Sequence, residues 1–124
     1  AVPLAAELGH TERLGVMAAL DVHRGRAWLA LGRADQAAAD GRAVLVLLDQ
    51  GIAPDSMYRP QAWWLAHQAL TAAGNPGEAA HALGRGAAWI FHAALPQVPP
   101  AFVESFLHRN AVNRELLAAA ARKH

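Results

Sequence analysis

The amino-acid sequence predicts an all-α protein, and three observations carry that prediction. Hydrophobic residues make up 54% of the 124 residues and charged residues only 17%, a balance typical of a folded domain with a core. Alanine, the strongest helix former, recurs along the whole chain, whereas aromatic residues make up only 6%. No stretch of useful length alternates between apolar and polar residues, as a half-buried strand would.

Glycine and proline divide the chain into segments of helical length. Gly9 is expected to end a first helix and Thr11 to cap the next, because glycine favours a helix C-terminus and threonine an N-terminus. Asn110 is expected to cap the last helix in the same way. The expected helices then run from Thr11 to about Leu31, Asp35 to Gln50, Pro60 to Gly74, Glu78 to about Ala94, Pro100 to about His108, and Ala111 to about Arg122.

Two segments, Leu31–Ala37 and Ala73–Ala79, share one pattern. In each, a helix ends in glycine, a short turn follows, and a small alanine opens the next helix. This pattern resembles the tetratricopeptide repeat, a family in which pairs of antiparallel helices stack side by side. The resemblance assigns repeat positions to Gly25, Trp28, Ala37, Trp63, Leu70 and Ala79.

The resemblance implies a single helical-repeat domain over residues 1–124. Residues 1–8 would end a truncated repeat, 11–50 and 57–94 would form two repeats, and 100–123 would be C-terminal capping helices. The sequence departs from the family pattern at His67, which is large for a small position, and in a spacing from Gly32 to Gly74 longer than the ~34 residues of a regular repeat. An unrelated helical bundle is the alternative.

The segment Ser105–Leu117 resembles the last two helices of large bacterial regulators. Those proteins join a signalling, nucleotide-cyclase or DNA-binding domain to an ATPase domain and tetratricopeptide-like repeats. The resemblance implies a C-terminal module of a bacterial regulator of transcription or signal transduction. It transfers no ATPase or cyclase activity. We see no signal peptide and no run of about 18 apolar residues, so we expect a cytoplasmic protein.

The residue types argue against catalysis, and we expect no enzyme activity, cofactor or metal. The sequence has no cysteine, which excludes thiolate metal sites and cysteine nucleophiles. No two histidines have the spacing that places two ligands on one helix face, although His67 and His81 could meet across a hairpin. The segment Gly84–Gly86 lacks the lysine of a phosphate-binding loop.

The charge balance bears on the partners. The formal net charge is only +1, which predicts neither nucleic-acid nor membrane binding. A basic tail around Arg109 and Arg114 could mimic a DNA-binding helix-turn-helix, but its apolar residues fit a capping role better.

We therefore expect a protein-interaction module that binds a protein or peptide segment on a concave face. The repeat resemblance places groove positions at Ala19, Val22, Arg26 and Leu29 in the first repeat and at Gln61, Trp64, Gln68 and Thr71 in the second. The binding strip expected from these is Arg26, Gln61, Trp64 and Gln68. Because adjacent helical residues point about 100° apart, a buried Trp63 would turn Trp64 toward the groove or a neighbouring helix. The alternative is Trp64 buried under the 50–59 loop.

The second expectation is a structural module, which packs on the rest of its own chain or forms a homodimer. It depends on the apolar side of residues 1–8, namely Val2, Leu4, Ala5 and Leu8, together with Leu14 and Met17.

Overall fold

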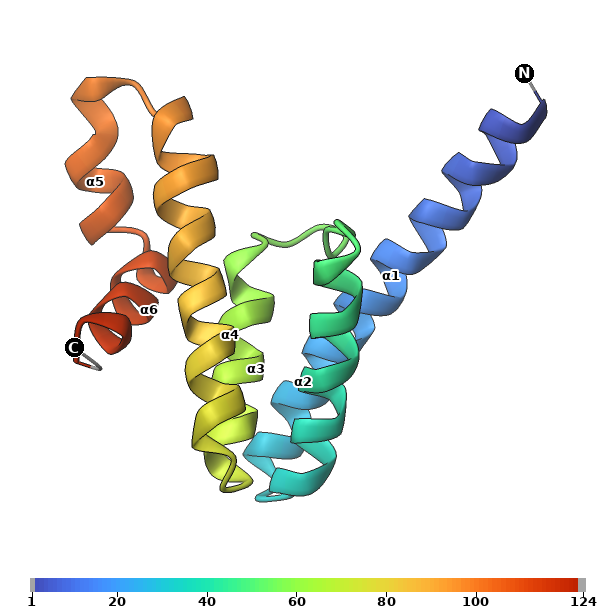
Figure 1. Cartoon of the computed structure of the whole chain (residues 1–124), viewed down its shortest axis with the longest axis horizontal. Helices are drawn as coiled ribbons and strands as arrows, with labels where there is room; N and C mark the ends of the chain where they lie inside the picture. Colours follow the sequence, from blue (N-terminus) through green and yellow to red (C-terminus); the bar gives the residue numbers. More distant parts are fainter. Residues whose placement is uncertain (1, 123–124) are drawn as a thin grey trace.

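The computed structural model describes residues 2–122, and their side chains from residue 9 onwards. The described residues form helices joined by turns and loops, with no strand among them, so the all-α prediction is confirmed (Figure 1). The α-helices are α1 (Val2–Ala30), α2 (Ala34–Asp49), α3 (Pro60–Ala72), α4 (Pro76–Trp89), α5 (Val103–His108) and α6 (Ala111–Arg122).

Helices that follow one another in the sequence pack side by side. α1 packs on α2, α2 on α3 and α3 on α4, and α1 also contacts α3. α5 and α6 form a further hairpin, which docks through α6 against α4 and α3. Figure 1 shows α1 and α6 on either side of α3, with the N-terminal half of α1 extending away from the other helices.

Three glycines end helices in the left-handed backbone conformation that they adopt without strain: Gly32 (φ 74°), Gly51 (φ 82°) and Gly74 (φ 80°). The helix ends at Gly32 and Gly74 close alike. The Arg33 amide donates to the Trp28 carbonyl at 2.8 Å, and the Asn75 amide to the Leu70 carbonyl at 2.9 Å. Both bonds join residues five apart, as in a Schellman motif.

The predicted break at Gly9 is wrong, and Thr11 caps no helix. α1 is a continuous helix of 29 residues that passes through both positions. A glycine inside a helix costs only about 1 kcal/mol relative to alanine, so the helix can continue through it. The side chains of Val2, Leu4, Ala5 and Leu8 lie outside the described residues, and the apolar edge expected there stays a prediction.

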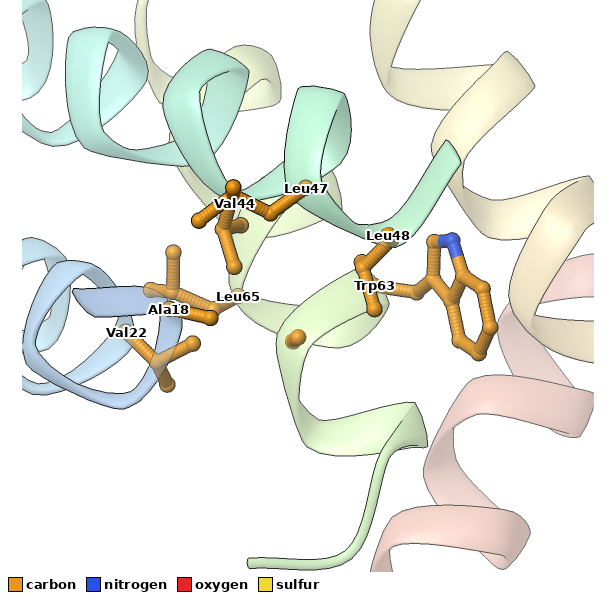
Figure 2. Close-up of a cluster of buried hydrophobic side chains, with 8 residues drawn as sticks. Ala18, Val22, Val44, Leu47, Leu48, Trp63 and Leu65 are labelled. Atoms are coloured by element: carbon orange, nitrogen blue, oxygen red, sulfur yellow. The ribbon is translucent and has the colours of Figure 1, made fainter. Parts of the chain in front are cut away.

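The first core cluster joins α1, α2 and α3 (Figure 2). Val22 of α1, Val44 of α2 and Leu65 of α3 are each almost fully buried. Gly25 allows α1 to lie close to α3, because a Cβ at this position would lie only 3.0 Å from Cδ1 of Leu65. The prediction that Ala19, Val22 and Leu29 line a groove is therefore wrong. Ala19 and Val22 are buried, and Leu29 packs against the cluster.

Most of the other positions that the repeat resemblance singles out lie in the interior. Ala37, Leu70 and Ala79 are fully buried between α2, α3 and α4. Trp63 is 4% exposed, and its ring centroid lies 6.2 Å from that of Trp89. Figure 2 shows its indole extending past Leu48 toward the ribbons of α4 and α6. Trp28 is half-buried, with the Arg33 guanidinium 5.9 Å from its ring centroid.

The C-terminal part of the chain begins with irregular helical turns. A π-helical turn at Ile90–Ala94 follows α4, so the helix expected to run to Ala94 leaves α-helical geometry after Trp89. The helix expected from Pro100 starts as a 3-10 turn, Pro100–Phe102, and becomes α-helical only at Val103. Proline lacks the N–H of a regular helix interior, which fits these short turns.

Candidate functional site

A hollow of about 290 Å³ lies where α1, α3 and α6 meet. Its lining includes all four residues of the expected binding strip: Arg26 on α1 and Gln61, Trp64 and Gln68 on α3. Leu65, Val112 and Glu115 complete the lining. The structure thus brings together side chains that the sequence placed in two separate repeats. Thr71, the remaining expected groove position, is exposed and does not line this hollow.

α3 forms the middle of the hollow. Gln61, Trp64 and Gln68 follow a three- to four-residue spacing, so they lie along one face of the helix. Pro60 starts α3 at its first turn, where a missing backbone N–H costs nothing, and Gly74 follows its end. Local sequence signals therefore determine where α3 begins and where it ends.

Trp64 is half-buried and belongs partly to the hollow and partly to the core. Its ring stacks on His67, with centroids 5.5 Å apart and planes 23° apart. It also packs against the cluster around Leu83, Ile90 and Leu116, which joins α4 to α6. Trp64 thus faces both the hollow and a neighbouring helix.

The 50–59 loop packs elsewhere. It places the Tyr58 ring 5.9 Å and the Arg59 guanidinium 5.5 Å from the ring centroid of Trp89. Ile52 and Met57 of this loop pack against the α1–α3 cluster. The alternative of Trp64 buried under this loop is therefore not what the contacts describe.

His67 fits at its crowded position because its ring has a polar partner. Its Nδ1 lies 2.9 Å from the Ala79 carbonyl oxygen, so Nδ1–H donates to α4. Only 9% of the residue is exposed. The bond supplies the buried ring with the partner that a polar group needs away from water. The residue that departs from the repeat pattern thus joins α3 to α4.

α6 supplies a wall of the hollow that the sequence reasoning missed. Asn113 positions this helix: it is fully buried, its Oδ1 accepts from the Tyr58 hydroxyl at 2.8 Å, and its Nδ2 donates to the Phe106 carbonyl at 2.9 Å. Asn110 caps α6 as expected, since its Oδ1 accepts a hydrogen bond from the backbone N–H of Asn113 at 3.0 Å. With Asn113 turned inward, Val112 and Glu115 reach the hollow.

α6 can approach α4 because Gly86 has no side chain. A Cβ at Gly86 would lie 2.9 Å from Cδ1 of Leu116 and 3.0 Å from Cβ of Trp63. The glycine pattern around Gly84 and Gly86 was the only available signal for this contact. Such a pattern permits a close approach without requiring one: a Cβ at Gly84 would meet nothing within 4 Å, and only Gly86 makes the contact.

An ion pair joins α1 to α2 two residues before Arg26, on a different face of α1. The Arg24 guanidinium donates to both carboxylate oxygens of Asp40 on α2, at 2.6–3.0 Å, and Asp40 is 5% exposed. The hydrogen bond to Asp40 raises the pKa of the Arg24 guanidinium. Arg26, two residues on, is exposed and lines the hollow.

The potential metal ligands are scattered over the described part of the chain. Within it, no three histidine, aspartate or glutamate side chains gather closely enough to hold a metal ion. His67 is bonded to a carbonyl, and His81 is exposed. None of the helices between residues 2 and 122 combines the length and the apolar character that a membrane crossing requires.

Comparison with protein-family models, curated protein sequences and solved structures gave no match to this chain.

Proposed function

We propose that this chain is a non-catalytic protein-interaction module and that it binds a short peptide or protein segment in the hollow between α1, α3 and α6. The observation that carries the proposal is the convergence of Arg26, Gln61, Trp64 and Gln68 on one hollow. The lining is more polar than that of a typical ligand pocket, so amide and charged groups should contribute to recognition beside the tryptophan face.

The size of the hollow favours a small part of a partner. Ligand pockets typically measure about 300–1,000 Å³, and this hollow of about 290 Å³ lies just below that range. It suits one or two side chains of a longer segment. Tryptophan is enriched among residues that dominate binding energy, so Trp64 is the expected anchor.

The resemblances add a setting to this proposal. Stacked hairpins similar to tetratricopeptide repeats, with a tail similar to that of bacterial regulators, suggest a module of a cytoplasmic protein that acts in transcription or signal transduction. In this setting the module needs no cofactor and touches neither nucleic acid nor membrane. Its partner is a protein or peptide, or another part of its own chain.

A selection from a displayed library of random peptides tests the proposal. Peptides enriched on the wild-type protein should lose binding to the Arg26→Ala and Gln68→Ala variants, since both exposed side chains line the hollow. Thr71→Ala is the matched control, because Thr71 is exposed on the same helix but lies outside the lining. Enriched peptides that bind all four proteins equally would place the binding surface elsewhere.

A second function is favoured by the outer face of α1. Val16, Met17 and Leu20 are 47%, 53% and 58% exposed, whereas Ala18 and Ala19 between them are buried in the core. Exposed apolar patches often mark contacts, so self-association is the alternative. Sedimentation at rising concentration should then show a dimer, which Leu20→Glu abolishes. A chain that sediments as a monomer throughout would rule the alternative out.

A further inference from the structure

The charged side chains of the hollow come from two different helices. Among the lining residues, Arg26 on α1 is the cation and Glu115 on α6 is the anion. Figure 1 shows these helices on either side of α3. The uncharged residues Gln61, Trp64 and Gln68 of α3 belong to the same lining. The hollow is therefore dipolar, positive toward α1 and negative toward α6.

Neither of these charges has a partner within the described residues. The ion pairs there are Arg24 with Asp21 and Asp40, Arg42 with Glu78, and Arg85 with Asp49. Arg42 and Glu78 join α2 to α4 through a two-bond contact, and the Arg85–Asp49 pair joins the same helices. Like Arg42 and Glu78, Arg26 and Glu115 are an exposed arginine and an exposed glutamate. Unlike them, they form no ion pair between helices within the described residues.

The glutamines of α3 suit a peptide backbone. Gln61 and Gln68 are two helical turns apart, about 10 Å along the axis, which is the length of about three residues of extended chain. An amide side chain can donate to a backbone carbonyl and accept from a backbone N–H. Contacts to the backbone do not distinguish one peptide sequence from another. Trp64, Arg26 and Glu115 would therefore select among sequences.

We propose, resting on the function proposed above, that the hollow selects a dipolar peptide segment. An acidic side chain of the segment pairs with Arg26, a basic side chain pairs with Glu115, and an apolar side chain between them packs on Trp64. The guanidinium can hold a carboxylate through two parallel hydrogen bonds. The segment binds in one direction, with its acidic end toward α1 and its basic end toward α6.

Four pools of seven-residue peptides, acetylated and amidated to remove terminal charge, test this selectivity. Each peptide has a central leucine or phenylalanine. One pool carries an acidic residue on one side and a basic residue on the other, the second pool only the acid, the third only the base, and the fourth neither. Affinity is measured by fluorescence anisotropy at low and at high salt. We expect the doubly charged pool to bind most tightly, and its advantage to shrink as salt screens the charges.

Charge reversal then identifies the partner of each charge. Arg26→Glu should weaken the acid-only pool about fivefold to tenfold, because attraction becomes repulsion, and leave the base-only pool no weaker. Glu115→Arg should do the reverse. Arg114→Glu and Glu104→Arg change the net charge by the same amounts on exposed positions outside the hollow, and both should bind like the wild type.

The outcomes separate this inference from the proposed function. Equal binding of the four pools, or equal effects of the hollow and control reversals, would overturn the dipolar selectivity and leave a peptide-binding hollow in place. Binding of none of the pools at concentrations up to about 1 mM would overturn both proposals.

Discussion

The Tyr58 hydroxyl donates a hydrogen bond of 2.8 Å to Oδ1 of Asn113, which lies 55 residues further along the chain. This bond joins the loop before α3 to the last helix. Asn113 also bonds to the Phe106 carbonyl in α5, so one buried amide connects three parts of the chain. Val112 and Glu115, which form a wall of the hollow, therefore depend on the contacts of Asn113 on the same helix.

Replacing Asn113 should be costly. Asn113→Ala leaves the Tyr58 hydroxyl and the Phe106 carbonyl without their partner, and we expect a loss of about 2–3 kcal/mol in the free energy of unfolding. Tyr58→Phe removes only one bond and should cost about 1 kcal/mol. Urea denaturation measures both. Asn113→Ala no more destabilising than Tyr58→Phe would show that the amide does not connect these segments.

Two glycines on α4 should respond to alanine in opposite ways. A Cβ at Gly86 meets Leu116 at 2.9 Å, whereas a Cβ at Gly84 meets nothing within 4 Å. We expect Gly84→Ala to stabilise the protein by about 0.5–1 kcal/mol, through helix propensity alone. Gly86→Ala should destabilise it by about 1–3 kcal/mol by forcing α6 away. Thermal unfolding of the pair is the measurement, and a stabilising Gly86→Ala would contradict the close docking of α6.

Truncation on α3 should distinguish the core from the hollow. Trp63 is 4% exposed, and Trp63→Ala should cost about 3–5 kcal/mol. Gln61 lies on the hollow side, and Gln61→Ala should stay within about 0.5 kcal/mol of the wild type. Equal denaturation midpoints would show that the assignment of the two faces of α3 is wrong.

The titration of the tyrosine should report the burial of the 50–59 loop. Burial raises the pKa of Tyr58 above its ordinary value of about 10, and Tyr58 is the only tyrosine in the sequence. The fold thus favours the neutral phenol. This contribution to stability is fully present below pH 10 and is lost as the pH rises through the raised pKa.

The tyrosinate absorbance of the folded protein should therefore titrate at higher pH than that of the urea-unfolded protein. Tyr58→Phe provides the blank. Identical titration curves in the two states would mean that the loop leaves Tyr58 in water.

Local signals in the sequence predicted most of the helix ends. Gly32, Gly51 and Gly74 end helices because the left-handed conformation and the closing hydrogen bond depend only on nearby residues. Gly9 offers the same local option, yet α1 continues through it. A glycine permits a helix end without requiring one, because an interior glycine costs the helix only about 1 kcal/mol.

The only part of the site that could be predicted from the sequence is the part formed by a single helix, α3. Gln61, Trp64 and Gln68 share a face of α3, and helical spacing alone places them together. Val22 was assigned to the groove but lies in the core, because the crossing of α1 over α3 sets which face is buried. Glu115 lines the hollow because α6 packs on α4 at Gly86. This contact joins segments far apart in the sequence, so helical spacing does not predict it.

The most direct test of the account is to map the binding surface by NMR. Amide chemical shifts of the folded chain are followed while the doubly charged peptide pool is added. We expect the largest changes on the side chains of Gln61, Trp64 and Gln68, on Arg26, and on Val112 and Glu115. Changes centred on Val16, Met17 and Leu20, or none at saturating peptide, would contradict this expectation.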